Sequence, residues 1–250
     1  MNRKKIIKQF EENFSHSPDK FLKYICKEKF IYQNANYLSP QLAIKYLKEN
    51  FEKKVNIYCF EDENYVIALN IEYSLKTKIS LDKFLFEGKV ITLYNKSTVD
   101  FDPEVFKRIG HLNWSNLFSS KITVEINKRF AENFFRHIFF DWKFNYPDYL
   151  DPEFFLKIKR APGGYNDIEL KFLDYFKRNQ IGLYYTKIVK IYGVGNLIII
   201  ESEGILPKRN NGGNIIFDLF IFKNTLISAH YKFISATHEA QIVNKQAIYS

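Results

Sequence analysis

The sequence predicts an α+β fold in which one arrangement of helices and strands occurs twice. Three observations support this prediction. Hydrophobic residues recur at helical spacing at the start of each half of the chain, and the pattern then changes to extended runs rich in Val, Ile, Phe and Tyr. The order of these segments is the same in both halves.

The first half begins with hydrophobic residues at helical spacing over residues 6–25, followed by a short extended segment at 29–33. Ser39 and Pro40 then begin another helix, which continues to Leu47. Serine at the N-cap accepts an amide hydrogen that the helix leaves unpaired, and proline in the next position has no amide hydrogen to lose. Two hairpins are predicted next, with strands over residues 55–60, 65–73, 81–86 and 90–94.

The second half repeats this order. A helix is predicted over residues 129–142, a turn of helix restarts at 151–153, and a short extended segment follows at 155–159. Asp167 can cap a third helix. The last two hairpins have predicted strands over residues 183–192, 197–203, 214–222 and 226–233.

These two blocks predict two domains, at residues 1–96 and 128–250. Residues 97–127 form the predicted connector, with a short helix at 102–108. Each domain is expected to contain three helices and a mostly antiparallel sheet.

A short motif recurs in the two halves without a gap. Residues 82–91 read Asp-Lys-Phe-Leu-Phe-Glu-Gly-Lys-Val-Ile, and residues 218–227, which lie 136 positions later, read Asp-Leu-Phe-Ile-Phe-Lys-Asn-Thr-Leu-Ile. This stretch and the order of elements resemble the nuclear transport factor 2-like, or cystatin-like, fold. The similarity is greatest to its SnoaL-like group, which includes polyketide cyclases and relatives of ketosteroid isomerase. The resemblance implies two cones, each with three helices covering a strongly curved sheet.

The chain departs from the usual motifs of that group in two places. Many members end in a Glu-His-Trp-Asp-like strand, whereas this chain has Ala229, His230, Tyr231 and Lys232. Members also often carry a histidine before a Pro-Gly pair, where this chain has Arg160. The acid–base set that the resemblance would imply is therefore incomplete, and no catalytic residue is assigned from the sequence.

Two strands are apolar on both faces. Residues 215–222 are apolar apart from Asp218, and residues 197–200 are apolar throughout. A strand with one face in water should alternate apolar and polar residues. Members of the resembled family commonly dimerise sheet to sheet, so we predict two cones packed as a pseudo-dimer within a monomer. The alternative is one cone in each half, loosely linked, in a true homodimer.

Composition narrows the function classes. The chain has 250 residues, of which 46% are hydrophobic and 18% aromatic, and its net charge of +9 is spread along the chain rather than gathered in one block. Nucleic acid is therefore an unlikely partner, because nucleic-acid readers concentrate basic residues on one stripe. No apolar run is long enough to span a membrane. We expect a cytoplasmic protein whose two cysteines are free thiols.

No cofactor or metal is predicted. The Gly193-Val-Gly195 stretch lacks the third glycine of a dinucleotide loop, and the five histidines show no zinc spacing. Acid–base chemistry on an apolar ligand instead needs a carboxylate or histidine base and a neutral hydrogen-bond donor. The residues that could supply these groups, or line a pocket around them, are Tyr24, Tyr32, Asn70, Glu72, Trp142, Tyr146, Arg160, Glu201 and His230.

Several of these residues also have a structural interpretation. His230 could be a hydrogen-bonded core histidine, and Asp82 and Asp218 could share one structural hydrogen bond rather than one reaction. Arg160 could bind an anionic ligand or cap a turn.

Two main functions from different classes remain open, beside a third in which a basic surface binds nucleic acid or acidic partners. The first is binding of a small, largely apolar or weakly anionic ligand in a cone-shaped pocket, with or without cyclase- or isomerase-like acid–base chemistry. The second is a non-enzymatic interaction module whose cavities are filled by its own Phe and Tyr. An open hollow near Arg160, Glu201 and His230 would favour the first function, and a hollow plugged by aromatic rings would favour the second.

Overall fold

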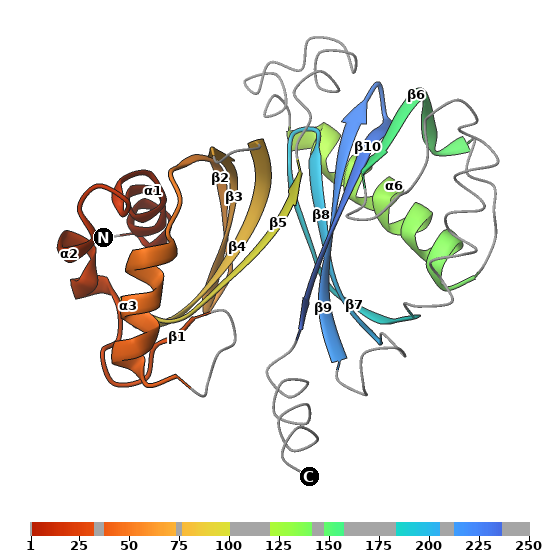
Figure 1. The fold of residues 1–250 in the computed structure, drawn as a ribbon. Coiled ribbons are helices and arrows are strands. Elements are labelled where there is room, and N and C mark those ends of the chain that lie inside the picture. Colours follow the sequence, from red (N-terminus) through yellow and green to blue (C-terminus); the bar gives the residue numbers. More distant parts are fainter. Residues whose placement is uncertain are drawn as a thin grey trace. The chain divides into compact units, whose positions relative to one another are not determined.

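The computed structural model describes residues 2–32, 38–73, 77–100, 121–141, 148–157, 184–205 and 213–236. The chain divides into two compact units, Met1–Asp102 and Pro103–Ser250. Each unit has its own five-stranded sheet with helical segments against it (Figure 1).

The described part of the first unit contains three helices, a single 3-10 turn and five strands. In chain order they are α1 (Arg3–Asn13), α2 (Pro18–Phe21), η1 (Leu22–Tyr24), β1 (Ile31–Tyr32), α3 (Pro40–Asn50), β2 (Lys54–Glu61), β3 (Tyr65–Tyr73), β4 (Thr77–Glu87) and β5 (Val90–Asp100). The sheet order is β1-β5-β4-β3-β2. The short strand β1 runs parallel to β5, and the other pairs are antiparallel.

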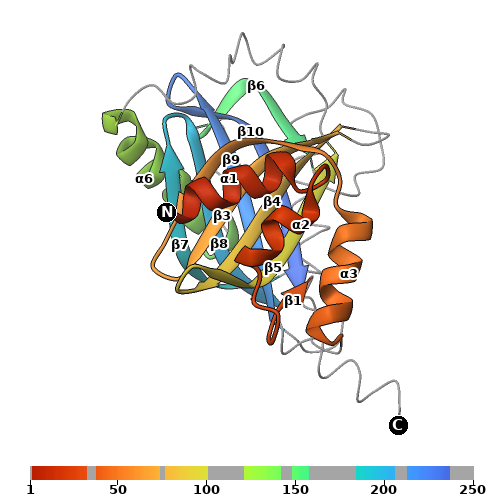
Figure 2. The same cartoon turned by 90° about the vertical axis from the view of Figure 1, so that its left-hand side faces the viewer.

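The helices of the first unit cover one face of its sheet, as Figure 2 shows. The α1 sequence places Ile6, Ile7, Phe10 and Phe14 on one stripe, and all four side chains are buried against the sheet. The helix α3 begins as predicted, because Pro40 opens it and the Ser39 hydroxyl accepts a hydrogen bond from the Leu42 amide at 3.3 Å.

The described part of the second unit has the same sheet topology. It contains α6 (Lys121–Phe139), β6 (Leu150–Lys157), β7 (Tyr184–Val194), β8 (Leu197–Ile205), β9 (Gly213–Lys223) and β10 (Leu226–Ala236). The order is β6-β10-β9-β8-β7, with β6 parallel to β10. The position of β1 in the first sheet is thus taken by β6, and that of β2 by β7.

The core of the second unit lies between α6 and the sheet. Phe134, Phe135 and Ile138 of α6 are buried with Ile198, Ile200, Ile216 and Phe220 of the strands. These strand residues define the helix-facing side of the sheet.

The structure differs from the sequence-based boundaries in three places. Residues 151–153 belong to strand β6, not to a turn of helix, because this segment pairs in parallel with β10. β5 continues to Asp100, beyond the predicted domain end at 96, since its partner β4 extends back to Lys78. α6 begins at Lys121, before the predicted helix start at 129. The helices predicted at 102–108 and after Asp167 lie outside the described residues.

Two further expectations concern compartment and redox state. In the ranges given above, no helix is long and apolar enough to cross a membrane. Cys26 and Cys59 are free thiols, as predicted. Burial raises the pKa of the Cys59 thiol to about 12, which makes this side chain unreactive.

Candidate functional site

The two sheets hold an aspartate at matching positions, and each aspartate is fully buried. Asp82 lies on β4 opposite Lys96 of β5, and Asp218 lies on β9 opposite Lys232 of β10. Each aspartate is bonded by the side chain two positions before that lysine, which is Tyr94 in the first unit and His230 in the second. The motif that recurs in the sequence therefore places a buried aspartate at the same position twice, bonded by a tyrosine in the first unit and by a histidine in the second.

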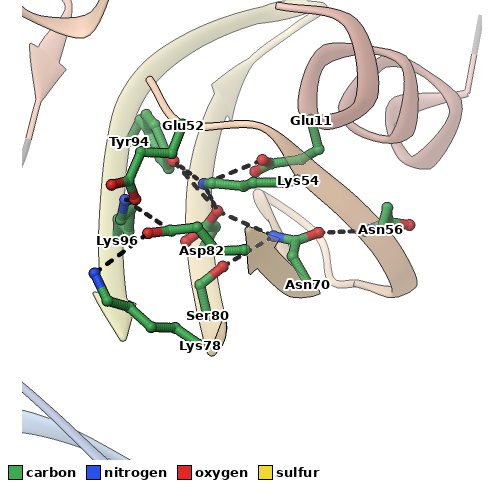
Figure 3. A network of polar contacts seen from close by, with 11 residues as sticks. Glu11, Glu52, Lys54, Asn56, Asn70, Lys78, Ser80, Asp82, Tyr94 and Lys96 are labelled. Carbon is green, nitrogen blue, oxygen red and sulfur yellow. Dashed lines mark hydrogen bonds and ion pairs between the residues drawn. The ribbon is translucent and has the colours of Figure 1, made fainter. Parts of the chain in front are cut away.

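In the first unit, three donors converge on one oxygen of Asp82, as Figure 3 shows. Asp82 Oδ2 accepts hydrogen bonds from Asn70 Nδ2 at 3.0 Å, from Tyr94 Oη at 3.2 Å and from Lys54 Nζ. Lys54 Nζ also donates to Tyr94 Oη at 2.6 Å. The lysine, the aspartate and the tyrosine are all buried, so a buried ammonium here has both a counter-ion and hydrogen bonds.

Helix α1 adds a second carboxyl group to this centre. Glu11 Oε2 lies 3.2 Å from Lys54 Nζ, and both side chains have no solvent-exposed surface. Burial, followed by the negative charge of Asp82, holds the pKa of Glu11 well above its ordinary value, even though Lys54 acts in the opposite direction. Burial likewise raises the pKa of Tyr94. The centre is therefore one charged pair, Lys54 with Asp82, accompanied by a neutral acid and a neutral phenol.

The polar contacts continue along the same face of the first sheet. The Asn56 amide donates to Asn70 Oδ1 at 2.8 Å. The buried carboxylate of Glu72 lies 2.8 Å from Lys96 Nζ and 3.8 Å from Lys78 Nζ. Thus the predicted residue Asn70 belongs to the network around Asp82 (Figure 3), and the predicted residue Glu72 forms ion pairs with Lys96 and Lys78.

Aromatic rings occupy the rest of this interior. Tyr94 stacks on Phe84 with ring centroids 4.5 Å apart, and the predicted residue Tyr32 lies 5.4 Å from Tyr94. Phe10 contacts both Phe84 and Tyr94 edge-on. The other predicted tyrosine of this unit, Tyr24, is half-buried and packs at the border of the same cluster.

In the second unit, His230 and Asp218 form a fully buried pair. His230 Nε2 lies 2.7 Å from Asp218 Oδ1. Asp218 Oδ2 accepts a hydrogen bond from Tyr185 Oη at 2.9 Å, and Lys232 Nζ lies 3.7 Å from Asp218 Oδ1. The Lys232 ammonium also lies over the rings of Phe139 and Tyr185, 4.6 and 4.9 Å from their centroids.

The surroundings fix the protonation states of this pair. Burial lowers the pKa of His230, against the opposing effect of Asp218. Burial alone would raise the pKa of Asp218, but Lys232, His230 and Tyr185 together lower it. Burial also lowers the pKa of Lys232, which Asp218 partly offsets. The favoured state is an aspartate anion beside a neutral imidazole.

The second ring nitrogen of His230 has a different environment. A carboxylate can only accept, so Nε2 carries the hydrogen and Nδ1 of the neutral ring carries a lone pair. Nδ1 is buried and has no hydrogen-bond partner among the described residues. The ring is held flat against Phe220, with centroids 4.5 Å apart and planes at 15°. An oriented, neutral imidazole with one nitrogen unpaired can accept a hydrogen bond or a proton.

The other predicted residues of the second unit lie elsewhere. Glu201 pairs with Phe217 across β8 and β9 and accepts a hydrogen bond from Tyr192 at 2.9 Å. Its neighbour Ile200 packs against α6, so Glu201 points to the opposite face of the sheet. The sheet therefore separates Glu201 from His230, contrary to the expectation that one hollow contains both. Trp142, Tyr146 and Arg160 lie outside the described residues.

Sequence reasoning missed Glu11, Lys54, Tyr185 and Lys232 as members of these centres. Glu11 carried a usable signal, because it shares helical spacing with the buried residues Ile7 and Phe14. Lys54 and Tyr185 carried none, since their roles depend on pairing between strands that are distant in the sequence. In the described part of the chain, no group of three or more His, Cys, Asp or Glu side chains could hold a metal ion.

The topology of both sheets, with helices on one face, is that of the nuclear transport factor 2-like fold, in tandem. No family model matches the sequence, and no curated protein was found to match it. Among solved structures, an LEH-like epoxide hydrolase from M. tuberculosis is 12% identical, with a TM-score of 0.37, over 50% of this chain and 96% of that chain. An NTF2-like protein from Anabaena variabilis is 14% identical, with a TM-score of 0.37, over 48% of this chain and 94% of that chain.

Proposed function

We propose that the chain binds a small, largely apolar molecule in its second unit, and that His230 is the acid–base group of this site. The observation that supports the proposal is the state of the His230 ring. Asp218 holds Nε2 at 2.7 Å, while the buried Nδ1 has no partner in the described part of the chain. Buried polar atoms in proteins are almost always paired, so a bound molecule is a natural partner for this nitrogen.

The chemistry available to such a site is proton transfer. A ligand C–H made acidic by a neighbouring carbonyl group can give its proton to Nδ1, and the electron pair of that bond moves onto the carbonyl oxygen as an enolate. The Asp218 carboxylate stabilises the resulting imidazolium, and the same proton returns to the ligand at another atom. The net reaction is an isomerisation or the activation of a carbon for ring closure.

The first unit favours a different role. Asp82 Oδ2 accepts hydrogen bonds from Lys54, Asn70 and Tyr94, its buried Oδ1 has no hydrogen-bond partner among the described residues, and aromatic rings pack around this centre. These observations support, for this unit alone, the aromatic-filled interior of the second candidate function, and we assign the first unit a structural role. The proposed division is therefore a supporting first unit and a ligand-binding second unit.

The test is hydrogen–deuterium exchange at the acidic C1 position of 2-tetralone in D₂O, followed by ¹H NMR. The wild-type protein is expected to accelerate this exchange, and His230→Gln is expected to reduce the acceleration by at least about 100-fold, the usual range for one acid–base group. Because burial lowers the pKa of His230, the activity should persist at pH values below the ordinary histidine range.

Tyr94→Phe provides the matched control, since it alters the equivalent position of the first unit and should leave the exchange rate unchanged. An exchange rate in the presence of wild-type protein that equals the rate with His230→Gln would contradict the proposal.

A further inference from the structure

The charges of the buried group formed by Asp218, His230 and Lys232 sum to zero. Asp218 is an anion, the Lys232 ammonium lies 3.7 Å from its Oδ1 atom, and His230 is neutral. No charge is left over in this group to pair with an ionised ligand. Transfer of an unpaired ionic group into such an interior costs several kcal/mol, so the site disfavours carboxylates and ammonium ions.

Several hydrogen-bond donors near His230 are already engaged, whereas the Lys232 ammonium lies at an ion-pair distance of 3.7 Å from Asp218 Oδ1. The His230 Nε2–H and the Tyr185 hydroxyl both donate to Asp218. The buried hydroxyls of Ser202 and Ser228 donate to the backbone carbonyls of Ile216 and Ile221, at 3.4 and 3.1 Å. His230 Nδ1 is the atom of this group that is buried without a hydrogen-bond partner among the described residues, and it is an acceptor.

Apolar side chains pack on the His230 ring and on the same face of the sheet. Phe220 lies flat against the imidazole ring, and Phe134 contacts Phe220 edge-on at 5.8 Å between centroids. Ile198, Ile200 and Ile216 are buried on the same face of the sheet. A ligand therefore needs an apolar body together with one donor group.

We infer that the second unit selects neutral, largely apolar molecules that carry a hydroxyl hydrogen (an alcohol, a phenol or an enol) over molecules that offer only an ether or carbonyl oxygen. A hydroxyl hydrogen pairs with His230 Nδ1, whereas an oxygen acceptor leaves two lone pairs facing each other in a buried site. This inference rests on the proposed function, because it names the class of ligand for the same site. It also predicts that a carbonyl substrate is held most tightly as its enol.

Three naphthalene probes of similar size test the inference by fluorescence titration of the wild-type protein: 2-naphthol, 2-methoxynaphthalene and 2-naphthoate. The first donates a hydrogen bond, the second only accepts, and the third is an anion. The expected result is that 2-naphthol binds at least about tenfold more tightly than either of the others, as one satisfied buried acceptor would give.

Two variants test whether the preference for 2-naphthol arises at His230. His230→Phe should abolish the preference for 2-naphthol, and Tyr94→Phe, at the matching position of the first unit, should retain it. If His230→Phe does not fold, the comparison of probes on the wild-type protein still decides the matter.

Equal affinities for 2-naphthol and 2-methoxynaphthalene would overturn the inference and leave the proposed function standing on the 2-tetralone exchange. Failure of all three probes to bind would overturn the inference, and failure of both the probes and the exchange would overturn the proposed function as well.

Discussion

At the scale of residues, the two aspartates show how one position can serve two purposes. Asp82 and Asp218 occupy matching places, but Asp82 receives three donors on one oxygen, one of them a buried lysine, whereas Asp218 orients a histidine. The exchange of Tyr94 for His230 matters because a phenol that donates to a carboxylate has no further basic atom, while an imidazole has a second nitrogen.

The sequence predicted part of this arrangement. His230 and Asn70 were expected to lie inside the cones, and the recurrence of the aspartate indicated a shared hydrogen bond at both positions. Glu201 was misplaced, because the apolar run before it concealed which face of the sheet was covered by helices. Lys54 could not be recognised, since its partners Asp82 and Tyr94 come from strands far along the chain.

One prediction at this scale concerns Glu11, whose pKa is raised in the folded protein. A raised pKa means that the folded state holds the proton more tightly than the unfolded state. The stabilisation from Glu11 is therefore complete below its ordinary pKa of about 4.5 and is lost as the pH rises through the folded-state value. Glu11→Gln removes this titration. The free energy of unfolding of the variant, relative to that of the wild type, should therefore increase as the pH is raised from acidic to alkaline values.

Urea unfolding at a series of pH values measures this difference in the free energy of unfolding. Each unit by which the folded state raises the pKa of Glu11 contributes about 1.4 kcal/mol to it. Glu12→Gln, a substitution at the neighbouring and less buried position, is the control and should show no such trend. A stability difference between Glu11→Gln and wild type that stays constant with pH would contradict the assignment.

At the scale of elements, the helices and hairpins were largely predictable because their signals are local. Ser39 and Pro40 mark the start of α3, and the stripe of Ile6, Phe10 and Phe14 marks the buried face of α1. β6 was predicted only from residue 155, because Asp151 and the following proline resemble a helix start. Its parallel pairing with β10 involves residues about 75 positions away, which no local pattern contains.

Close packing of α6 on β7 gives a second prediction. A Cβ atom added at Gly193 would lie 2.8 to 2.9 Å from side-chain atoms of Lys128, Val124 and Ile198. Gly193→Ala should therefore lower the free energy of unfolding by about 1–3 kcal/mol, the range typical of overpacked cores.

Urea unfolding again provides the measurement. Val189→Ala, at an exposed position of the same strand, should change stability by less than about 0.5 kcal/mol. Gly193→Ala that unfolds at the same urea concentration as the wild type would show that α6 does not approach the strand so closely.

At the scale of the whole molecule, the chain is a tandem of two units with one topology and different interiors. The aromatic content of 18% is explained by the rings that pack between helices and sheet in both units. The sheet-to-sheet pseudo-dimer and the oligomeric state stay predictions. The central claim is that the first unit has become structural, through Lys54 and Glu11, and that the second unit holds the ligand site at His230.

Native mass spectrometry with 2-naphthol tests that claim most directly, because it counts bound probe molecules per chain. One molecule per chain is predicted for the wild type and for Tyr94→Phe, and none for His230→Phe. Two molecules per chain, or one molecule that is lost in Tyr94→Phe and kept in His230→Phe, would contradict the division of function between the units.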